Sequence, residues 1–246
     1  MIEVEKVKPY NETEGKKKQI ATMFDQVAGS YDFLNRLLSL GIDVYWRRKA
    51  IAKLHARQPK LVLDVASGTA DVALEIHRRI KNVKVTGIDI SEKMLELGRI
   101  KVEKAGANSS IVLQSGDAEA LQFADDSFDA ITVSFGVRNF ENVEKGLQEF
   151  YRVLKPGGLL MVLEFSRPRL FPLKQLFNAY FKYILPLIGR VTSKDPRAYA
   201  YLYESVQAFP DRERFTALMD KAGFCQTAFE AWTIGIVCCY VGEKKK

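Results

Sequence analysis

The stretch Leu61-Val62-Leu63-Asp64-Val65-Ala66-Ser67-Gly68-Thr69-Ala70-Asp71 decides the fold predicted for this chain. Its first five residues are four apolar side chains around one acid, a run that is typical of a buried strand and too short for a helix. Small residues with turn and capping chemistry follow. Asp71 suits the first turn of a helix, because it meets the positive end of the helix dipole. The stretch therefore predicts a strand, a tight turn and the start of a helix.

A second acidic residue follows this turn, at a spacing along the chain that can serve ligand binding. Asp89 closes another apolar run, residues 83–88. In a doubly wound sheet, an acid about 20 residues beyond such a turn can bind the two hydroxyls of a ribose. The turn alone leaves two interpretations equally open: a nucleotide-binding turn, or a βαβ unit that binds no ligand.

The rest of the chain alternates strands with helices. Apolar runs at residues 83–88, 111–113, 128–133 and 159–163 predict four further strands, separated by helical patterns. This alternation favours an α/β fold, a doubly wound and mostly parallel sheet with helices on both faces. Ligands of such sheets bind beyond the carboxyl ends of the strands, which are polar here: Asp64, Asp89, Asp117, Ser134 and Glu164.

Helical segments stand on both sides of this core. Before it, apolar residues recur at intervals of three and four over residues 24–38, and a second helix follows over residues 46–54, so these helices can lie over the strand ends. After it, residues 167–210 carry an apolar stripe: Phe177, Tyr180, Phe181, Ile184 and Ile188, broken by Pro186 and Gly189. The stripe fits a lid over an apolar ligand, a lipid-facing surface or a homodimer contact. Residues 224–230 and 233–241 predict two closing antiparallel strands.

Composition and charge narrow the class of protein. The chain has 246 residues, 47% of them hydrophobic, which suffices for one sizeable α/β domain. No apolar run is long enough to span a bilayer, and the N-terminus is unlike a signal peptide, so we expect a cytoplasmic protein. The cysteines form neither a disulfide framework nor a metal set, and Cys238 and Cys239 should point to opposite faces of a strand. We predict no bound metal.

The net charge of +7 comes partly from lysines near both ends, residues 16–18 and 244–246. The favoured interpretation is solvated, mobile tails, with residues 1–18 forming a loose polar arm. The alternative is peripheral attraction to an anionic membrane, at its inner face, or to nucleic acid. No basic stretch interleaved with aromatic residues supports nucleic acid, so we expect no nucleic-acid partner.

Four segments between residues 24 and 209 resemble the ubiquinone and menaquinone biosynthesis C-methyltransferases, within the class I S-adenosylmethionine methyltransferases. They are Tyr31-Asp32-Phe33-Leu34-Asn35 with Leu38-Ser39-Leu40-Gly41 and Trp46; Phe135-Gly136-Val137-Arg138-Asn139; Arg152-Val153-Leu154-Lys155-Pro156-Gly157-Gly158 with Leu163-Glu164-Phe165-Ser166; and Tyr199-Ala200-Tyr201-Leu202-Tyr203-Glu204-Ser205-Val206. The resemblance implies a seven-stranded sheet with a reversed last strand.

The resemblance also implies one methyltransferase domain over residues 1–246. We divide it into an N-terminal helical segment (1–58), a cofactor-binding core (59–166), a helical and aromatic substrate lid (167–210) and a closing helix with a hairpin (211–246). The wider class prefers glycine at three alternating positions of the turn, where this chain has Ala66, Gly68 and Ala70. Alanine takes a positive φ only at a cost, so both alanines fit easily if only one of the three positions needs it.

The cofactor that the resemblance implies is S-adenosylmethionine. The helix N-terminus after Thr69 offers free N–H groups to its carboxylate, and Thr69 can add a hydroxyl. Asp64 and the carbonyls of the turn around Gly68 can take the ammonium, and Asp89 suits the ribose hydroxyls. Asp117 and the Ala118 N–H are expected to read the adenine edge, and Ser134 to lie where the sulfonium and the acceptor meet.

The implied reaction is methyl transfer to a ring carbon of a polyprenylated quinol, demethylmenaquinol or its ubiquinone-pathway counterpart. A quinol hydroxyl that loses its proton pushes charge onto the neighbouring ring carbon, which attacks the sulfonium methyl in line. Arg138 would stabilise the phenolate, and Asn139 and Tyr31 would orient the hydroxyl or a water. Glu164 fits a base or a structural acid equally well. The alternatives are another apolar acceptor such as a phenol or sterol, an RNA methyltransferase, or a binding module without catalysis.

Overall fold

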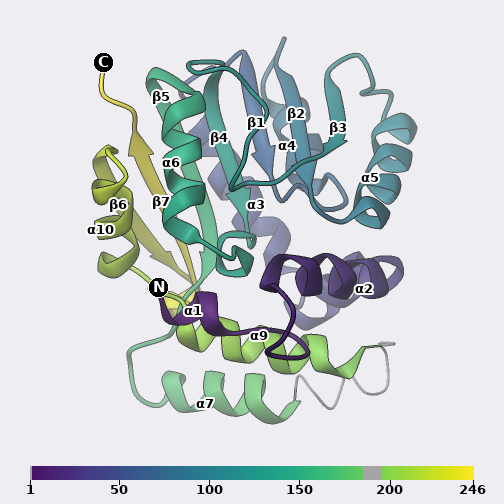
Figure 1. Cartoon of the computed structure of the whole chain (residues 1–246), viewed down its shortest axis with the longest axis vertical. Helices are drawn as coiled ribbons and strands as arrows, with labels where there is room; N and C mark the ends of the chain where they lie inside the picture. Colours follow the sequence, from purple (N-terminus) through teal and green to yellow (C-terminus); the bar gives the residue numbers. More distant parts are fainter. Residues whose placement is uncertain (1, 185–194) are drawn as a thin grey trace.

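The computed structural model describes residues 2–184 and 195–246, and Figure 1 shows a central sheet covered by helices. Within these residues the sheet has seven strands in the order β3-β2-β1-β4-β5-β7-β6. The strands are β1 Leu61–Val65, β2 Lys84–Asp89, β3 Ile111–Ser115, β4 Phe128–Ser134, β5 Leu154–Phe165, β6 Cys225–Trp232 and β7 Val237–Glu243.

The strand directions confirm the predicted doubly wound fold with a reversed last strand. Strands β1 to β5 pair in parallel, whereas β7 runs antiparallel to both β5 and β6. The chain runs outward from β1 to β3 and then returns to place β4 on the other side of β1. The carboxyl ends of β1 and β4 therefore flank a switch point, which is where ligands of open α/β sheets bind.

Helices cover both faces of the sheet. The helices α3 Ile42–His55, α4 Asp71–Arg79 and α5 Glu92–Lys104 pack on one face, and α6 Val143–Val153 and α10 Glu213–Lys221 pack on the other. Cys239 lies in the first of these hydrophobic cores and Cys238 in the second. This confirms that the two cysteines point to opposite faces of one strand.

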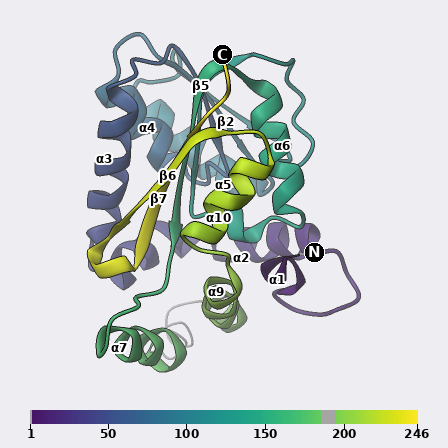
Figure 2. The ribbon, with the colours of Figure 1, turned by 90° about the vertical axis from the view of Figure 1, so that its left-hand side faces the viewer.

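A further group of helices lies across the carboxyl ends of the strands, at the bottom of Figure 1. It consists of α1 Glu3–Lys6, α2 Lys16–Leu38, α7 Leu173–Ala179 with the short π-helix η2 Tyr180–Ile184, and α9 Pro196–Ala208. Figure 2 shows α7 and α9 below the sheet, with the C-terminus at the opposite end. Among the described residues, no helix is long and apolar enough to cross a membrane.

The polar face of α2 explains why this helix lies over the strand ends. Asp25 accepts a hydrogen bond of 2.6 Å from the Ser91 hydroxyl, which caps α5 after β2. Asp32 accepts a bond of the same length from the Thr69 hydroxyl, in the turn after β1. The two carboxylates thus fasten α2 to two neighbouring strand ends, while its apolar face packs inward, as the helical periodicity predicted.

The expectation of a loose polar arm over residues 1–18 is wrong for the described part. α1 packs on the core with Val4 fully buried, residues 16–18 begin α2, and the ammonium of Lys16 donates to the Val4 carbonyl at 2.6 Å. The strand predicted over residues 159–163 is longer, because β5 begins at Leu154 and contains residues 155–158 as an irregularity that shifts its register against β4. The stripe positions Pro186, Ile188 and Gly189 lie outside the described residues.

Candidate active site

The turn after β1 bends more sharply than the sequence predicted. Ala66, Gly68 and Ala70 all have left-handed backbones, with φ of 53°, 53° and 67°. The expectation that one positive φ would suffice is therefore wrong, and both alanines carry backbone strain. The turn also approaches the one after β4 closely, because a Cβ added to Gly136 would lie 2.6 Å from the Ala66 Cβ.

Changing Ala66 to glycine is expected to raise the free energy of unfolding by about 0.5–1 kcal/mol, because glycine takes this φ without strain. Ala70→Gly is the matched control. It relieves the same strain but removes a fully buried methyl group, which costs about 0.8 kcal/mol, so its net effect is near zero. Denaturant unfolding measures both variants, and equal destabilisation by the two would contradict the strain.

Below this turn lies a cavity that most of the predicted cofactor residues line. It is bordered by Gly68, Asp89, Asp117, Ala118 and Ser134, as well as by Ala66, Gly116 and Gly136. The Asp89 carboxylate accepts from the Gly68 N–H at 2.8 Å and from the Ser91 N–H at 2.9 Å. Burial raises the pKa of Asp89, although these N–H groups oppose the shift. The structure thus brings five of the predicted cofactor residues together around one space.

Two predicted cofactor residues lie behind the turn instead. Asp64 is buried, accepts from the Thr132 hydroxyl at 2.7 Å, and has one carboxylate oxygen without a hydrogen-bond partner among the described residues. Burial raises its pKa to about 7. The Thr69 hydroxyl is 2.9 Å from the Lys101 ammonium and donates to Asp32. Neither side chain borders the cavity, so both support the turn in this structure, and their direct contacts with a cofactor stay predictions.

The residues present fit S-adenosylmethionine by chemistry. The uncapped start of α4 has N–H groups for a carboxylate, since its N-cap Ala70 makes no side-chain bond. Asp89 keeps acceptor positions for a diol, and Asp117 and Ala118 stand at the same cavity. At the same site, the Lys17 ammonium forms an ion pair of 2.6 Å with the Asp117 carboxylate.

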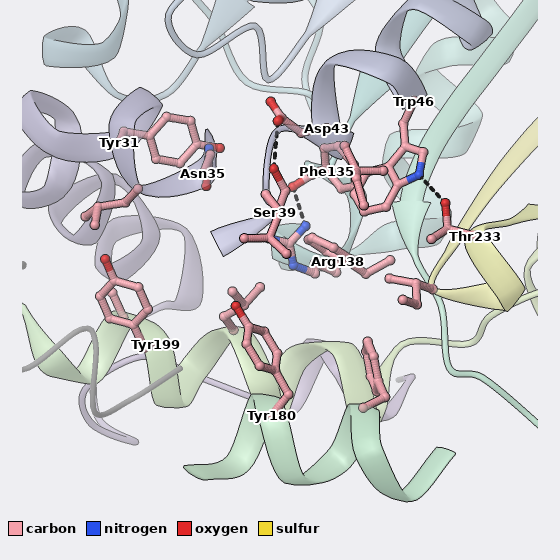
Figure 3. Close-up of a pocket in the computed structure, with 18 of the residues that line it drawn as sticks. Tyr31, Asn35, Ser39, Asp43, Trp46, Phe135, Arg138, Tyr180, Tyr199 and Thr233 are labelled. Atoms are coloured by element: carbon pink, nitrogen blue, oxygen red, sulfur yellow. Dashed lines mark hydrogen bonds between the residues drawn. The ribbon is translucent and has the colours of Figure 1, made fainter. Parts of the chain in front are cut away.

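A second, larger cavity of about 450 Å³ adjoins the first, and Figure 3 shows its lining. Its lining is mostly apolar and aromatic, with Asn35, Asp43 and Arg47 among the polar members. The apolar walls come from α2, α3, the end of β5, α7 with η2, and α9, and they include Leu34, Trp46, Phe165, Phe177, Tyr180 and Tyr199. The aromatic segment after β5 therefore forms one wall of a cavity, as a lid over an apolar ligand would. Phe24, Tyr31, Phe135 and Asn139 line both cavities, so they form the wall between them.

Arg138 lies in the apolar cavity, in the 3-10 turn η1 Val137–Asn139 after β4. One guanidinium nitrogen donates to Glu164 at 2.8 Å and to the Phe135 carbonyl at 2.5 Å. The Nε atom is buried without a partner among the described residues. Because Arg138 borders the cavity, its guanidinium can donate a charge-assisted hydrogen bond to a phenolate oxygen that is bound there.

Glu164 has the role of a structural acid in this arrangement. It is fully buried, lies outside the cavity lining, and accepts from the Arg138 guanidinium and from the N–H groups of Arg138 and Phe165. These bonds occupy the carboxylate and hold Arg138 in place.

Two residues at this site were missed in the sequence. Tyr201, 2% exposed, donates to the Asn139 side-chain oxygen at 3.1 Å and so fixes the orientation of that amide. Lys16 donates to the Arg138 carbonyl at 2.9 Å. The segment 199–206 signalled Tyr201 only as part of a family motif, whereas nothing in the sequence distinguishes Lys16 from its neighbours.

Burial raises the pKa of Tyr31, so it stays a hydrogen-bond donor at neutral pH.

The buried Lys16 predicts a pH dependence of stability. Burial, with a smaller contribution from Arg138, lowers the pKa of its ammonium from 10.5 to about 7, against the attraction of nearby carboxylates. Between these two pH values the unfolded chain binds a proton here that the folded chain does not. The free energy of unfolding should therefore rise with pH over this window relative to Lys16→Met. If the free energy of unfolding changed with pH in the same way for both proteins, the lowered pKa of Lys16 would be contradicted.

The fold and the two adjoining cavities define a class I S-adenosylmethionine-dependent methyltransferase. The model of the ubiE/COQ5 methyltransferase family matches residues 12–244. The chain belongs to this family.

Similar proteins agree with this assignment. A demethylmenaquinone methyltransferase of Bacteroides fragilis is 46% identical over 98% of both chains. A ubiquinone/menaquinone biosynthesis C-methyltransferase UbiE of Geotalea daltonii is 48% identical over 93% of this chain and 97% of its own. A solved SAM-dependent methyltransferase of Thermotoga maritima has a TM-score of 0.64 at 22% identity, covering 91% of this chain and 99% of its own, and supports the fold.

Proposed function

We propose that this enzyme methylates a ring carbon of a polyprenylated quinol, in the step from demethylmenaquinol to menaquinol or its ubiquinone-pathway counterpart. The observation that carries the proposal is the Arg138 guanidinium, which borders a mostly apolar and aromatic cavity that shares a wall with the cofactor cavity. A flat, apolar ring with an ionisable hydroxyl group suits such a cavity. The names of the relatives point to the same class of substrate.

The cofactor, when bound, supplies an electrophilic methyl group. The chain's own residues then have three tasks. Arg138 stabilises the phenolate of the acceptor by a charge-assisted hydrogen bond and so favours loss of the hydroxyl proton. The loss of that proton raises the electron density at the neighbouring ring carbon. Asn139, held by Tyr201, and Tyr31 orient the hydroxyl at the wall between the cavities. The aromatic lining excludes water from the ring.

An activity assay with two reduced acceptors tests the proposal. Purified protein with S-adenosylmethionine should methylate a prenylated demethyl-naphthoquinol, a prenylated demethyl-benzoquinol, or both. The comparison of the two rates identifies the ring type. No turnover on either acceptor, with cofactor binding intact, would refute the proposal.

An acceptor with an isoprenoid tail resides in a membrane. We therefore propose that the enzyme works from the cytoplasm and meets its acceptor at the inner membrane surface. Two features support this: the apolar cavity, and the exposed apolar residues at its mouth, which include Leu40 and Ile234.

A further inference from the structure

The mostly apolar cavity of about 450 Å³ is called the acceptor cavity below, and Leu40 and Ile234 border it. Phe171 lies in the loop between Pro168 and Leu173, which also border it. We call the exposed side chains of Leu40, Phe171 and Ile234 the mouth rim. Leu40, Phe171 and Ile234 are 84%, 81% and 60% exposed. They belong to the α2–α3 turn, the loop before α7 and the 3-10 turn η3 Thr233–Gly235. In Figure 2 the start of α3, the tip of the β6–β7 hairpin and α7 lie at the same lower side of the molecule. Three segments that are distant in the sequence therefore each expose an apolar side chain on this side of the molecule.

Two residues of the mouth rim have backbone conformations that are unfavourable for their residue types. Leu40 has a φ of 50° and Ile234 a φ of 56°, where glycine or asparagine is the usual residue. For a β-branched residue such as Ile234 this is a genuine outlier. Neither the strain nor the exposure stabilises the folded chain, yet both side chains border the cavity. Such a combination indicates that the side chains serve a function outside the core.

The charge of the adjoining segment indicates what the rim contacts. Residues 166–184 contain four basic residues and no acidic one: Arg167, Arg169, Lys174 and Lys182. Arg167 pairs with Asp211 at 3.0 Å and Arg169 with Glu213 at 2.7 Å, so the charge offered to a partner comes from the two lysines. Lys174 and Lys182 are exposed, and the Lys182 ammonium lies 5.4 Å from the ring of the exposed Tyr183. Exposed aliphatic and aromatic side chains beside basic ones are typical of surfaces that bind anionic lipid bilayers.

We propose that the mouth rim, with the basic segment 166–184, docks on an anionic lipid bilayer, so that the acceptor cavity opens onto the acyl chains. The inference rests on the proposed function, because an isoprenoid tail is what would pass between bilayer and cavity. The proposed docking surface replaces the alternative considered from the sequence, in which the lysine-rich ends of the chain bind the membrane. Lys16 and Lys17 are engaged inside the protein, and the C-terminal lysines lie at the opposite end of the sheet from α7.

Vesicle flotation of the full chain tests the docking surface. The vesicles are phosphatidylcholine, with or without phosphatidylglycerol. The rim variant is Leu40→Asn/Phe171→Ser/Ile234→Asn, in which asparagine accepts the left-handed backbone and so preserves the turns. The matched control, Ile100→Gln/Val112→Thr, removes exposed apolar groups from α5 and β3. A second control, Lys245→Ala/Lys246→Ala, removes charge at the far end. Thermal unfolding checks that all variants are folded.

We expect the wild type to float with anionic vesicles and several-fold less with neutral ones, and the rim variant to bind about tenfold more weakly or worse. Both controls should bind as the wild type does. Equal binding by the rim variant, or equal loss in the controls, would overturn the inference. It would also be overturned if the wild type does not float and the rim variant instead converts a dimer to a monomer in light scattering, since the rim would then join two copies.

The two proposals fail in different ways. A wild type that methylates a soluble short-chain quinol but does not float contradicts the docking surface alone. A wild type that floats but methylates no quinol contradicts the proposed function alone.

Discussion

Replacing Arg138 by methionine together with Glu164 by glutamine is expected to lower kcat by about 10²–10³-fold, the usual loss when a donor to a developing oxyanion is removed. Cofactor affinity should stay close to that of the wild type, because Arg138 borders the acceptor cavity and not the cofactor cavity. The double change avoids a confounding effect, since it leaves no unpaired charge in the buried pair. Steady-state kinetics and a titration with S-adenosylmethionine measure the two quantities separately.

The single variants are the controls. Glu164→Gln keeps the guanidinium but loosens its orientation, so a loss of about tenfold in kcat is expected. Arg138→Met alone leaves Glu164 charged and unpaired in the core, and should cost about 3–5 kcal/mol of stability. A double variant with near wild-type kcat would contradict the role of Arg138. So would a fall in cofactor affinity that matches the fall in rate.

Asp89→Ala is expected to weaken S-adenosylmethionine binding by about 100-fold or more, because the lost carboxylate is a charged acceptor for a ligand diol. It also holds the turn after β1 through the Gly68 N–H and the start of α5 through the Ser91 N–H. The affinity should fall while the rate at saturating cofactor falls less, because Asp89 does not line the acceptor cavity. Calorimetric titration gives the affinity directly.

Asp129→Ala is the matched control for Asp89→Ala. Asp129 also accepts from two backbone N–H groups, those of Lys60 and Leu61, at 2.8 Å each, but at the amino end of β1. It should lose stability without losing cofactor affinity. Equal losses of affinity in the two variants would show that Asp89 acts only through the fold.

Local patterns in the sequence predicted the architecture well, because each strand and its polar end are encoded in a few adjacent residues. The strand and turn of residues 61–71 and the two closing antiparallel strands were predicted from such runs, whereas the reversed last strand of a seven-stranded sheet was implied by the family resemblance. The positive φ values of Ala66 and Ala70 were not predicted. They accompany the close approach of a second turn at Gly136, which is a tertiary contact and leaves no local pattern in the sequence.

The parts of the site that the sequence did not predict depend on contacts between distant residues. Lys16 is buried because α1 folds back over it, and a four-residue helix leaves almost no periodic signal. Asp25 and Asp32 look like an ordinary solvated face until the strand ends that they contact are in place. The bond from Tyr201 to Asn139 spans 62 residues, so no local pattern indicates it.

The most direct test of the account is the position of a labelled methyl group after a single turnover. Protein loaded with S-adenosylmethionine that carries a ¹³C methyl group is mixed with a reduced, prenylated demethylquinol, and the product is analysed by NMR. We predict a carbon–carbon bond from the label to the ring carbon beside the hydroxyl. Label on a quinol oxygen, as a methyl ether, or label that stays on the cofactor would contradict it.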